Sequence, residues 1–137
     1  MATAPVSPAP APAQVSQGEV LPPPACAELR SYVWRAVRLY PELRSRIIAA
    51  GELAALYEIR RLDPATHIYS VPSQSNALGS YTVRLGREGT CTCPDYPRAP
   101  RGYCKHRLAV ALVLRIQADA AARAAQAPDY IDDHLSC

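Results

Sequence analysis

Two closely spaced pairs of metal-binding residues constrain this chain more than any other feature of its sequence. Cys91 and Cys93 form the first pair, and Cys104 and His106 follow after a loop of ten residues. Three thiolates and one imidazole are the donor set of a closed tetrahedral zinc site. The spacing therefore predicts one structural Zn²⁺ ion, around which this part of the chain folds.

The spacing also predicts how each pair is held. Residues i and i+2 of a strand point to the same side, so Cys91 and Cys93 aim two sulfurs at one point if they lie in an extended segment. A two-residue step along a helix turns by about 200° around its axis, so Cys104 and His106 cannot share a helical face. We expect Cys104 just before a helix and His106 in its first turn, where the helix N-terminus supplies donors to the thiolates.

Other interpretations of these four residues stay open. They include ordinary buried cysteines, iron–sulfur ligands, a redox Cys-x-Cys pair and a Cys–His nucleophile dyad. Two tight pairs disfavour chance burial, and a dyad lacks an evident third group to orient it. We therefore predict no catalytic residues and do not expect an enzyme.

Hydrophobic periodicity predicts helices ahead of the metal ligands. Residues 25–40 carry apolar side chains on one face at helical spacing, namely Leu29, Val33, Val37 and Tyr40. Pro41 ends this helix and suits the start of a second one over residues 42–50, for which Gly51 is the expected C-terminal cap. Residues 52–57 fit either a further helical turn or the approach to a strand.

The period then changes from helical to alternating. Residues 67–71, including His67, and residues 81–85 alternate in the manner of strands, and residues 90–92 form a third extended piece carrying the first ligand pair. These pieces predict an antiparallel hairpin or meander. The prolines of the following loop exclude a helix there, and a largely apolar run predicts a last helix over residues 105–126.

The ligand segments resemble a known family. Cys91-Thr-Cys93-Pro-Asp-Tyr96, followed by Cys104-Lys-His106-Arg-Leu-Ala-Val110, is similar to the SWIM zinc finger, whose pattern is C-x-C, a variable loop and C-x-H. The upstream segments 69–75 and 81–83 resemble the strands that precede the ligands in small prokaryotic or transposon-associated members. The resemblance covers about residues 66–117 and implies a ββα zinc module that binds DNA or protein. A transposase's chemistry is not carried over, because no catalytic domain is evident beside the finger.

These observations predict an α+β fold in which a small ββα zinc finger, an antiparallel hairpin or meander plus a C-terminal helix, is preceded by one or two N-terminal helices. The expected division is a disordered Pro/Ala-rich tail over 1–24, a helical segment over 25–62, the SWIM-type zinc finger domain over 63–126 and an acidic C-terminal tail over 127–137. Within the last tail, Asp132, Asp133, His134 and Cys137 offer a second, less favoured metal site.

Positive charge gathers around the predicted zinc ligands. Residues 81–115 contain seven basic and two acidic side chains, whereas the whole chain has a net charge of +3. Such a surface favours contact with phosphates. We expect DNA or another nucleic acid to contact Arg84, Arg87, Arg98, Arg101, Lys105 and Arg107. Tyr96 and Tyr103 either stack on bases or pack over the zinc loop.

Two other functions remain open on the sequence alone. One is a protein–protein adaptor with a purely structural zinc, and the other is an accessory fragment of a mobile-element or recombination system. We expect neither a small-molecule substrate nor a membrane partner, because no stretch reaches the roughly 18–20 apolar residues of a span. We expect a cytoplasmic location, because residues 2–24 lack the pattern of a signal peptide and the cysteines suit a reducing compartment.

Overall fold

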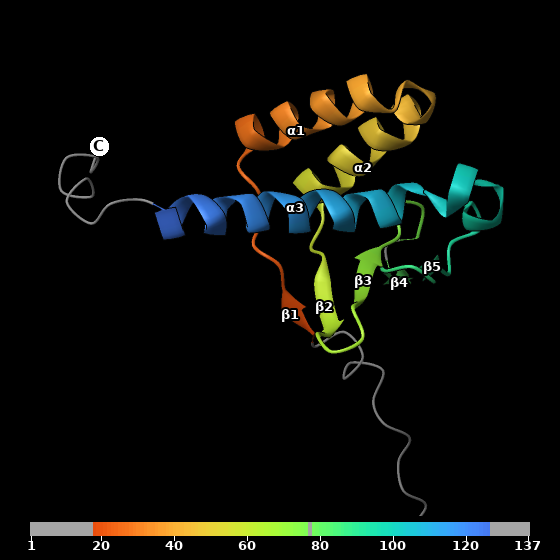
Figure 1. The fold of residues 1–137 in the computed structure, drawn as a ribbon. Coiled ribbons are helices and arrows are strands. Elements are labelled where there is room, and N and C mark those ends of the chain that lie inside the picture. Colours follow the sequence, from red (N-terminus) through yellow and green to blue (C-terminus); the bar gives the residue numbers. More distant parts are fainter. Residues whose placement is uncertain (1–17, 77, 127–137) are drawn as a thin grey trace, which may run out of the picture.

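The computed structural model describes residues 18–76 and 78–126. These residues form one antiparallel sheet with the strand order β1-β2-β3-β4-β5, together with three α-helices (Figure 1). The strands are β1 (Glu19–Val20), β2 (Arg60–Asp63), β3 (Ile68–Pro72), β4 (Ser80–Arg84) and β5 (Thr90–Cys91). The helices are α1 (Cys26–Leu39), α2 (Arg44–Leu56) and α3 (Lys105–Gln126), with short 3₁₀ helices η2 (Pro41–Leu43), η3 (Tyr96–Arg98) and η4 (Pro100–Gly102).

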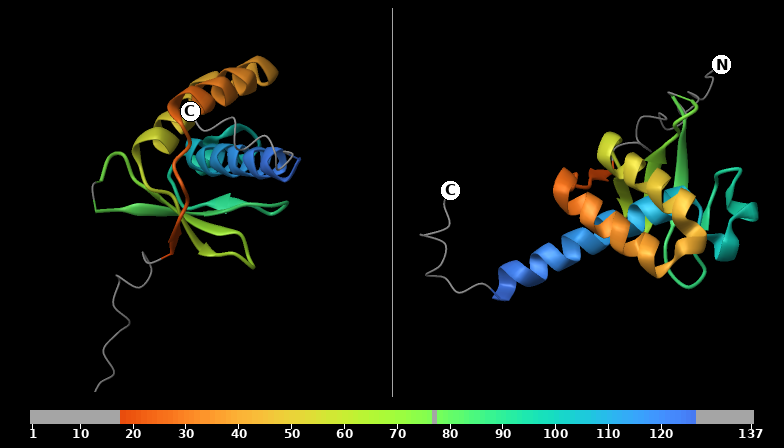
Figure 2. Two further views of the ribbon diagram at one scale, coloured as in Figure 1. Left: turned by 90° about the vertical axis from the view of Figure 1, so that its left-hand side faces the viewer. Right: turned by 90° about the horizontal axis from the view of Figure 1, so that it is seen from above.

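Helix α3 lies between the sheet and the pair formed by α1 and α2 (Figures 1 and 2). It contacts β3, β4 and β5 on one side and α1 and α2 on the other. The arrangement gives three layers, with α3 in the middle. It confirms the predicted α+β class, the antiparallel strands and the C-terminal helix.

The middle position of α3 follows from its sequence. Its buried side chains recur three or four residues apart, as His106, Ala109, Val110, Val113 and Ile116. This stripe joins the core formed with the sheet and the other two helices. From residue 120 onward the helix is exposed and extends beyond the other layers (Figure 2). Within residues 18–76 and 78–126, no helix combines the length and the apolar character needed to cross a membrane.

Helix α2 differs from the prediction at its C-terminal end. The helix continues through Gly51 to Leu56, so Gly51 is an interior residue and not a cap. A Cβ atom at this position would lie 2.8 Å from Cγ2 of Val33 in α1. Gly51 therefore allows the two helices to approach closely, and residues 52–56 take the helical alternative that the sequence left open.

Two strands of the sheet were not predicted. Strand β2 has the sequence Arg-Arg-Leu-Asp and is half-buried at all four positions, so it shows no alternation. Strand β1 pairs with β2 and lies within the range assigned to the N-terminal tail. The next residue, Leu21, is 4% exposed and donates its N–H to the carbonyl of Ile59 at 2.8 Å. Backbone pairing at the sheet edge, which hydropathy does not encode, thus brings residues 19–21 into the fold.

The strands nearest the zinc ligands agree with the prediction within a residue. Strand β4 pairs with β3 along its whole length and with β5 at Val83 and Arg84. His67 is the exception, since it lies in the turn before β3 with a positive φ of 57° and is not a strand residue. Residues 1–17 of the tail predicted over 1–24 lie outside the described residues, as does the acidic tail over 127–137 with its alternative metal site.

Candidate metal centre and the basic residues around it

Strand β5 and the residue after it present the first ligand pair. Cys91 pairs with Val83 of β4, and the pairing continues as the Thr92 N–H donates to the carbonyl of Thr82 at 3.1 Å. Cys91 and Cys93 are buried, whereas Thr90 and Thr92 are exposed. The side chains thus alternate as in an extended strand, and both sulfurs point into the protein.

The second ligand pair stands at the start of α3. Cys104 immediately precedes the helix and is fully buried, and its carbonyl accepts a hydrogen bond from the N–H of Leu108 at 3.0 Å. His106 occupies the first turn and is 3% exposed. The two residues converge because one is the last non-helical residue and the other is helical.

The four ligand atoms form one compact cluster. The three sulfurs and a ring nitrogen of His106 all lie within 4.8 Å of one another, and all four residues are buried. Tetrahedral zinc, with bonds of about 2.0 to 2.3 Å, places its donor atoms a little under 4 Å apart. The cluster is therefore close to the size that a zinc ion requires.

The imidazole of His106 supports a metal more directly. Both ring nitrogens are buried, and neither has a hydrogen-bond partner among the described residues. The ring packs against that of Tyr81, with centroids 4.6 Å apart. A buried, unpaired polar nitrogen is unfavourable by about 1–3 kcal/mol, whereas coordination to a metal would satisfy it.

The pKa values of the three thiols differ because of burial and of the hydrogen bonds between their sulfurs. The pKa of Cys104 is lowered to about 4, chiefly because the Cys91 thiol donates a hydrogen bond to its sulfur, and the backbone N–H of Arg107 contributes in the same direction. The same hydrogen bond, together with burial, raises the pKa of Cys91, and burial raises that of Cys93. Zn²⁺ would supply the positive charge that stabilises all three sulfurs as thiolates.

An ion pair ties the loop between the ligand pairs to the helical layer. Arg46 of α2 donates from Nε and Nη2 to the two carboxylate oxygens of Asp95, each at 3.1 Å. This hydrogen bonding lowers the pKa of Asp95. The sequence pattern does not single out Arg46, because the contact spans 49 residues and no local spacing indicates it. Tyr81 beside His106, in contrast, lies on the inward face that its alternation with Val83 indicates.

Three of the six predicted basic residues gather in one place. Arg87, Arg101 and Arg107 line a polar hollow of about 560 Å³, together with Tyr96 and Tyr103. Arg87 comes from the turn between β4 and β5, Arg101 from η4 and Arg107 from the first turn of α3. We call this site the arginine hollow.

The other three predicted residues do not line the arginine hollow. Lys105 lines a different depression, and its Nζ donates to Oε1 of Gln74 at 2.6 Å. Arg84 is exposed on β4, and Arg98 is exposed on η3. The basic face predicted from the sequence thus consists of one cluster of three arginines and three separate cations.

The comparisons with known proteins concern the same segment. Residues 81–115 match the family model of the SWIM zinc finger, and this range includes all four ligands. The match is shorter than the resemblance over residues 66–117 and covers well under half of the chain. No curated protein and no solved structure matches the chain. The SWIM zinc finger is a binding module and not a catalytic family. The ligand geometry and the family match thus lead to one conclusion: this chain contains a SWIM zinc finger whose Cys₃His cluster fits one structural Zn²⁺ ion.

Proposed function

We propose that this zinc-binding module binds nucleic acid, with DNA as the first candidate, and that the arginine hollow is the centre of the contact. The observation that carries the proposal is the convergence of Arg87, Arg101 and Arg107 on one open polar site beside the zinc loop. Arginine pairs with phosphate oxygens through two parallel N–H donors. Three arginine side chains around one hollow can therefore bind several phosphates of a nucleic-acid backbone.

The charge around the hollow supports this proposal. None of these three arginines has a carboxylate within salt-bridge distance among the described residues, and Glu88 is the one acidic side chain in the lining. Arg87 and Arg101 are exposed, so their guanidinium groups are available to phosphates. Arg107 is half-buried and donates to the carbonyl of Gly102 at 2.8 Å, which holds the floor of the hollow in place.

The two tyrosines of the hollow differ in their surroundings. The Tyr96 hydroxyl donates to the carbonyl of Gly89 at 2.9 Å, and its ring packs beside Gly102, so we assign it to the packing of the loop. Tyr103 is 40% exposed, and the Arg107 guanidinium lies 5.6 Å from its ring centroid. An exposed ring backed by a cation suits stacking on a nucleobase, which contributes about 1–3 kcal/mol per base.

The backbone of the hollow leaves little room for larger residues. A Cβ atom on Gly89 would come within 2.4 Å of the Arg107 guanidinium and within 2.6 Å of the Arg84 carbonyl. Gly102 has a φ of 74°, in the left-handed region that favours glycine. The close contacts at these glycines hold the two loops together, and Arg87 and Arg101 from these loops line the same hollow.

The test is a titration of the zinc-loaded full chain with single- and double-stranded DNA over a range of salt concentrations. We expect affinity to fall steeply with salt. A plot of the logarithm of the binding constant against the logarithm of the salt concentration gives a slope. We expect the double variant Arg87→Ala plus Arg101→Ala to reduce the magnitude of this slope by about one for each phosphate that it no longer neutralises. Tyr103→Ala is expected to weaken binding with little change in the slope.

Two exposed arginines provide matched controls. Arg98→Ala removes a cation from the finger but outside the hollow, and Arg30→Ala removes one from α1. We expect a smaller effect for the first and none for the second. A salt-insensitive interaction, or no binding to either form of DNA, would contradict the proposal.

A further inference from the structure

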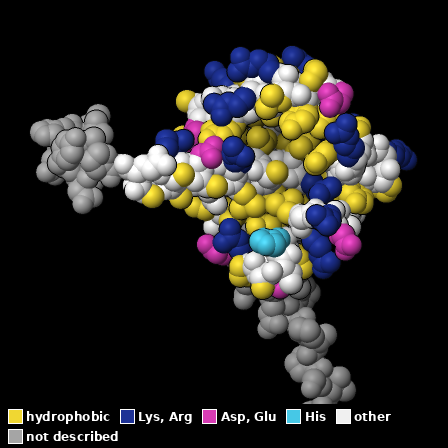
Figure 3. Space-filling model, viewed as in Figure 1, with side chains coloured by type: hydrophobic (Ala, Val, Ile, Leu, Met, Phe, Trp, Pro, Cys, Tyr) yellow, Lys and Arg dark blue, Asp and Glu magenta, His cyan; other side chains and the backbone are white. Residues whose placement is uncertain are grey.

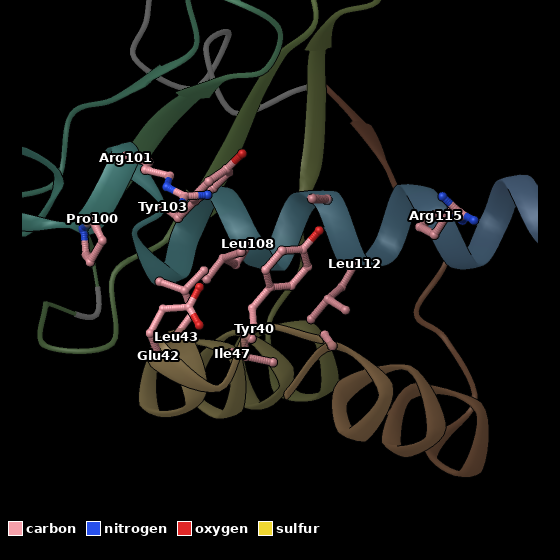
Figure 4. A pocket seen from close by; sticks show the side chains of 12 residues that line it. Tyr40, Glu42, Leu43, Ile47, Pro100, Arg101, Tyr103, Leu108, Leu112 and Arg115 are labelled. Carbon is pink, nitrogen blue, oxygen red and sulfur yellow. The ribbon is translucent and has the colours of Figure 1, made fainter. Parts of the chain in front are cut away.

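A second hollow of different chemistry lies on the helical side of the molecule. It has a volume of about 510 Å³ and opens between α3 and the segment formed by α1, η2 and α2. Figure 4 shows Leu108 and Leu112 of α3 opposite Tyr40, with Arg101 and Arg115 at the two ends. We call it the apolar groove.

One wall of the apolar groove is a helical stripe that residues 18–76 and 78–126 cover only in part. Leu108, Ala111, Leu112 and Arg115 of α3 follow one another at positions i, i+3, i+4 and i+7, and all four line the groove. This spacing is one continuous face of a helix, about two turns long. Such a face packs naturally against a further helix.

The opposite lip exposes apolar groups to solvent. Tyr40, which lines the groove, is 49% exposed, whereas Leu43 and Ile47 in the same lining are buried. A contiguous apolar hollow with a half-exposed tyrosine at its edge is typical of a protein contact, because aromatic side chains are enriched there. The groove therefore has the composition of a docking surface.

The charge at its border selects the kind of partner. Figure 3 shows the apolar hollow bordered mainly by Lys and Arg side chains. Arg101 and Arg115 line its two ends, and Glu42 is the acidic residue in the lining. Arg115 already pairs with Asp119 through Nε, which lies 3.2 Å from Oδ1, so its two terminal guanidinium nitrogens remain for a partner's carboxylate. Arg38 and Arg44 lie just before and just after the segment from Tyr40 to Leu43 in the sequence. Neither has a carboxylate within salt-bridge distance among the described residues.

We propose that the apolar groove binds an amphipathic helix of a protein partner, with leucine-like side chains on one face and Asp or Glu beside them. The apolar face of that helix packs on the stripe of α3, and its carboxylates meet the arginines at the border. A second copy of this chain is a poorer occupant, because a symmetric contact through the same surface would bring the basic border of one copy against that of the other.

The groove can be separated from the arginine hollow by mutation. Arg101 and Tyr103 line both sites, so they do not discriminate between them. Leu112 and Arg115 line only the apolar groove, and Arg87 lines only the arginine hollow. Substitutions at these three positions therefore test the two sites independently.

The experiment measures fluorescence polarisation of a labelled helical peptide with leucines at i, i+3, i+4 and i+7 and glutamates on its flanks. The matched probe carries lysines in place of the glutamates. With the zinc-loaded full chain, we expect the acidic peptide to bind roughly tenfold more tightly than the basic one. We expect Leu112→Glu to abolish binding, Arg115→Glu to weaken it several-fold and Arg87→Glu to leave it unchanged.

Zinc content and circular dichroism verify that each variant is folded. Because Leu112 is half-buried, Arg115→Glu at an exposed position keeps the test decisive if Leu112→Glu does not fold. Absence of acidic-peptide binding, equal affinity for the two peptides, or binding unaffected by Arg115→Glu would overturn the proposal. The proposal would also be overturned if the chain self-associated and Arg115→Glu abolished that self-association, because the groove would then bind a second copy. It would likewise be overturned if DNA displaced the peptide equally from the wild-type protein and from Arg87→Glu, because the groove would then bind DNA.

Discussion

At the scale of single residues, the metal centre joins two kinds of local structure. Cys91 and Cys93 converge because a strand repeats its direction every second residue, and Cys104 and His106 converge because the helix begins between them. His106 has no hydrogen-bond partner for either buried nitrogen within the described residues. Each ligand is therefore placed by backbone conformation, and zinc completes an arrangement that protein contacts alone leave unsatisfied.

Replacement of one ligand is expected to abolish the site. Cys104→Ser removes a fully buried sulfur from the cluster, so we expect the bound zinc to fall from one ion per chain towards none and the finger to lose its fold. Metal analysis and thermal unfolding of the purified variant measure both effects.

The matched control is Cys26→Ser, because Cys26 is exposed at the start of α1 and lies outside the cluster. We expect this variant to keep its zinc and to change the free energy of unfolding by no more than about 0.5 kcal/mol. Equal zinc loss in both variants would show that the proposed ligand set is wrong.

At the scale of secondary-structure elements, the fit of α1 against α2 depends on Gly51. Alanine at this position gains about 1 kcal/mol from helix propensity, but its Cβ would lie 2.8 Å from Cγ2 of Val33, a stiff β-branched side chain. Overpacking of this kind costs about 1–3 kcal/mol. We expect Gly51→Ala to lower the free energy of unfolding by about 1 kcal/mol, as measured with urea on the zinc-loaded protein.

The same pair allows a test by double mutation. In a Val33→Ala background the clash disappears, so Gly51→Ala is expected to become stabilising. If Gly51→Ala had the same effect in both backgrounds, Val33 would not be the contact that requires glycine.

A hydrogen bond between elements ties α1 to the second half of α3. The Tyr32 hydroxyl donates to the carboxylate of Asp119, and this bond, followed by that from Arg115, lowers the pKa of Asp119. Because the pKa of Asp119 is lower in the folded than in the unfolded protein, its ionised form stabilises the fold. This stabilisation is fully present at pH values above the pKa of the unfolded state, about 3.9, and is lost as the pH falls through the pKa of the folded state. Tyr32→Phe is therefore expected to lower the thermal midpoint equally at about pH 6 and about pH 8. If the difference in thermal midpoint between wild type and Tyr32→Phe changed between these two pH values, the assignment of the low pKa to Asp119 would be wrong.

The elements also show what the sequence could reveal. The alternation at Tyr81 and Val83 and the apolar run after His106 predict β4 and α3, because each buries a regular face. Strand β2 could not be predicted because its four half-buried residues show no alternation of polar and apolar side chains. Strand β1 could not be predicted because a strand of two residues is too short to show such an alternation. The metal ligands are predictable from local spacing. Arg46 beside Asp95, and the clustering of three arginines, arise from contacts between distant segments and require the fold.

At the scale of the whole molecule, α3 connects every functional feature. Its first turn carries His106 and Arg107, one face packs on the sheet, and another lines the apolar groove. Zinc fixes β5 to the start of this helix, so it fixes the position of the arginine hollow relative to the sheet. Both proposed binding sites consequently depend on the metal centre.

If one zinc ion holds the start of α3 against β5, removal of the metal releases these segments, and amide hydrogen exchange on the full chain measures that release. One zinc per chain is expected before chelation. After chelation, we predict that β4, β5 and the first turns of α3 lose their protection from exchange, because four buried ligands lose their common partner. Unchanged protection of these segments in the metal-free protein would contradict a structural role for zinc.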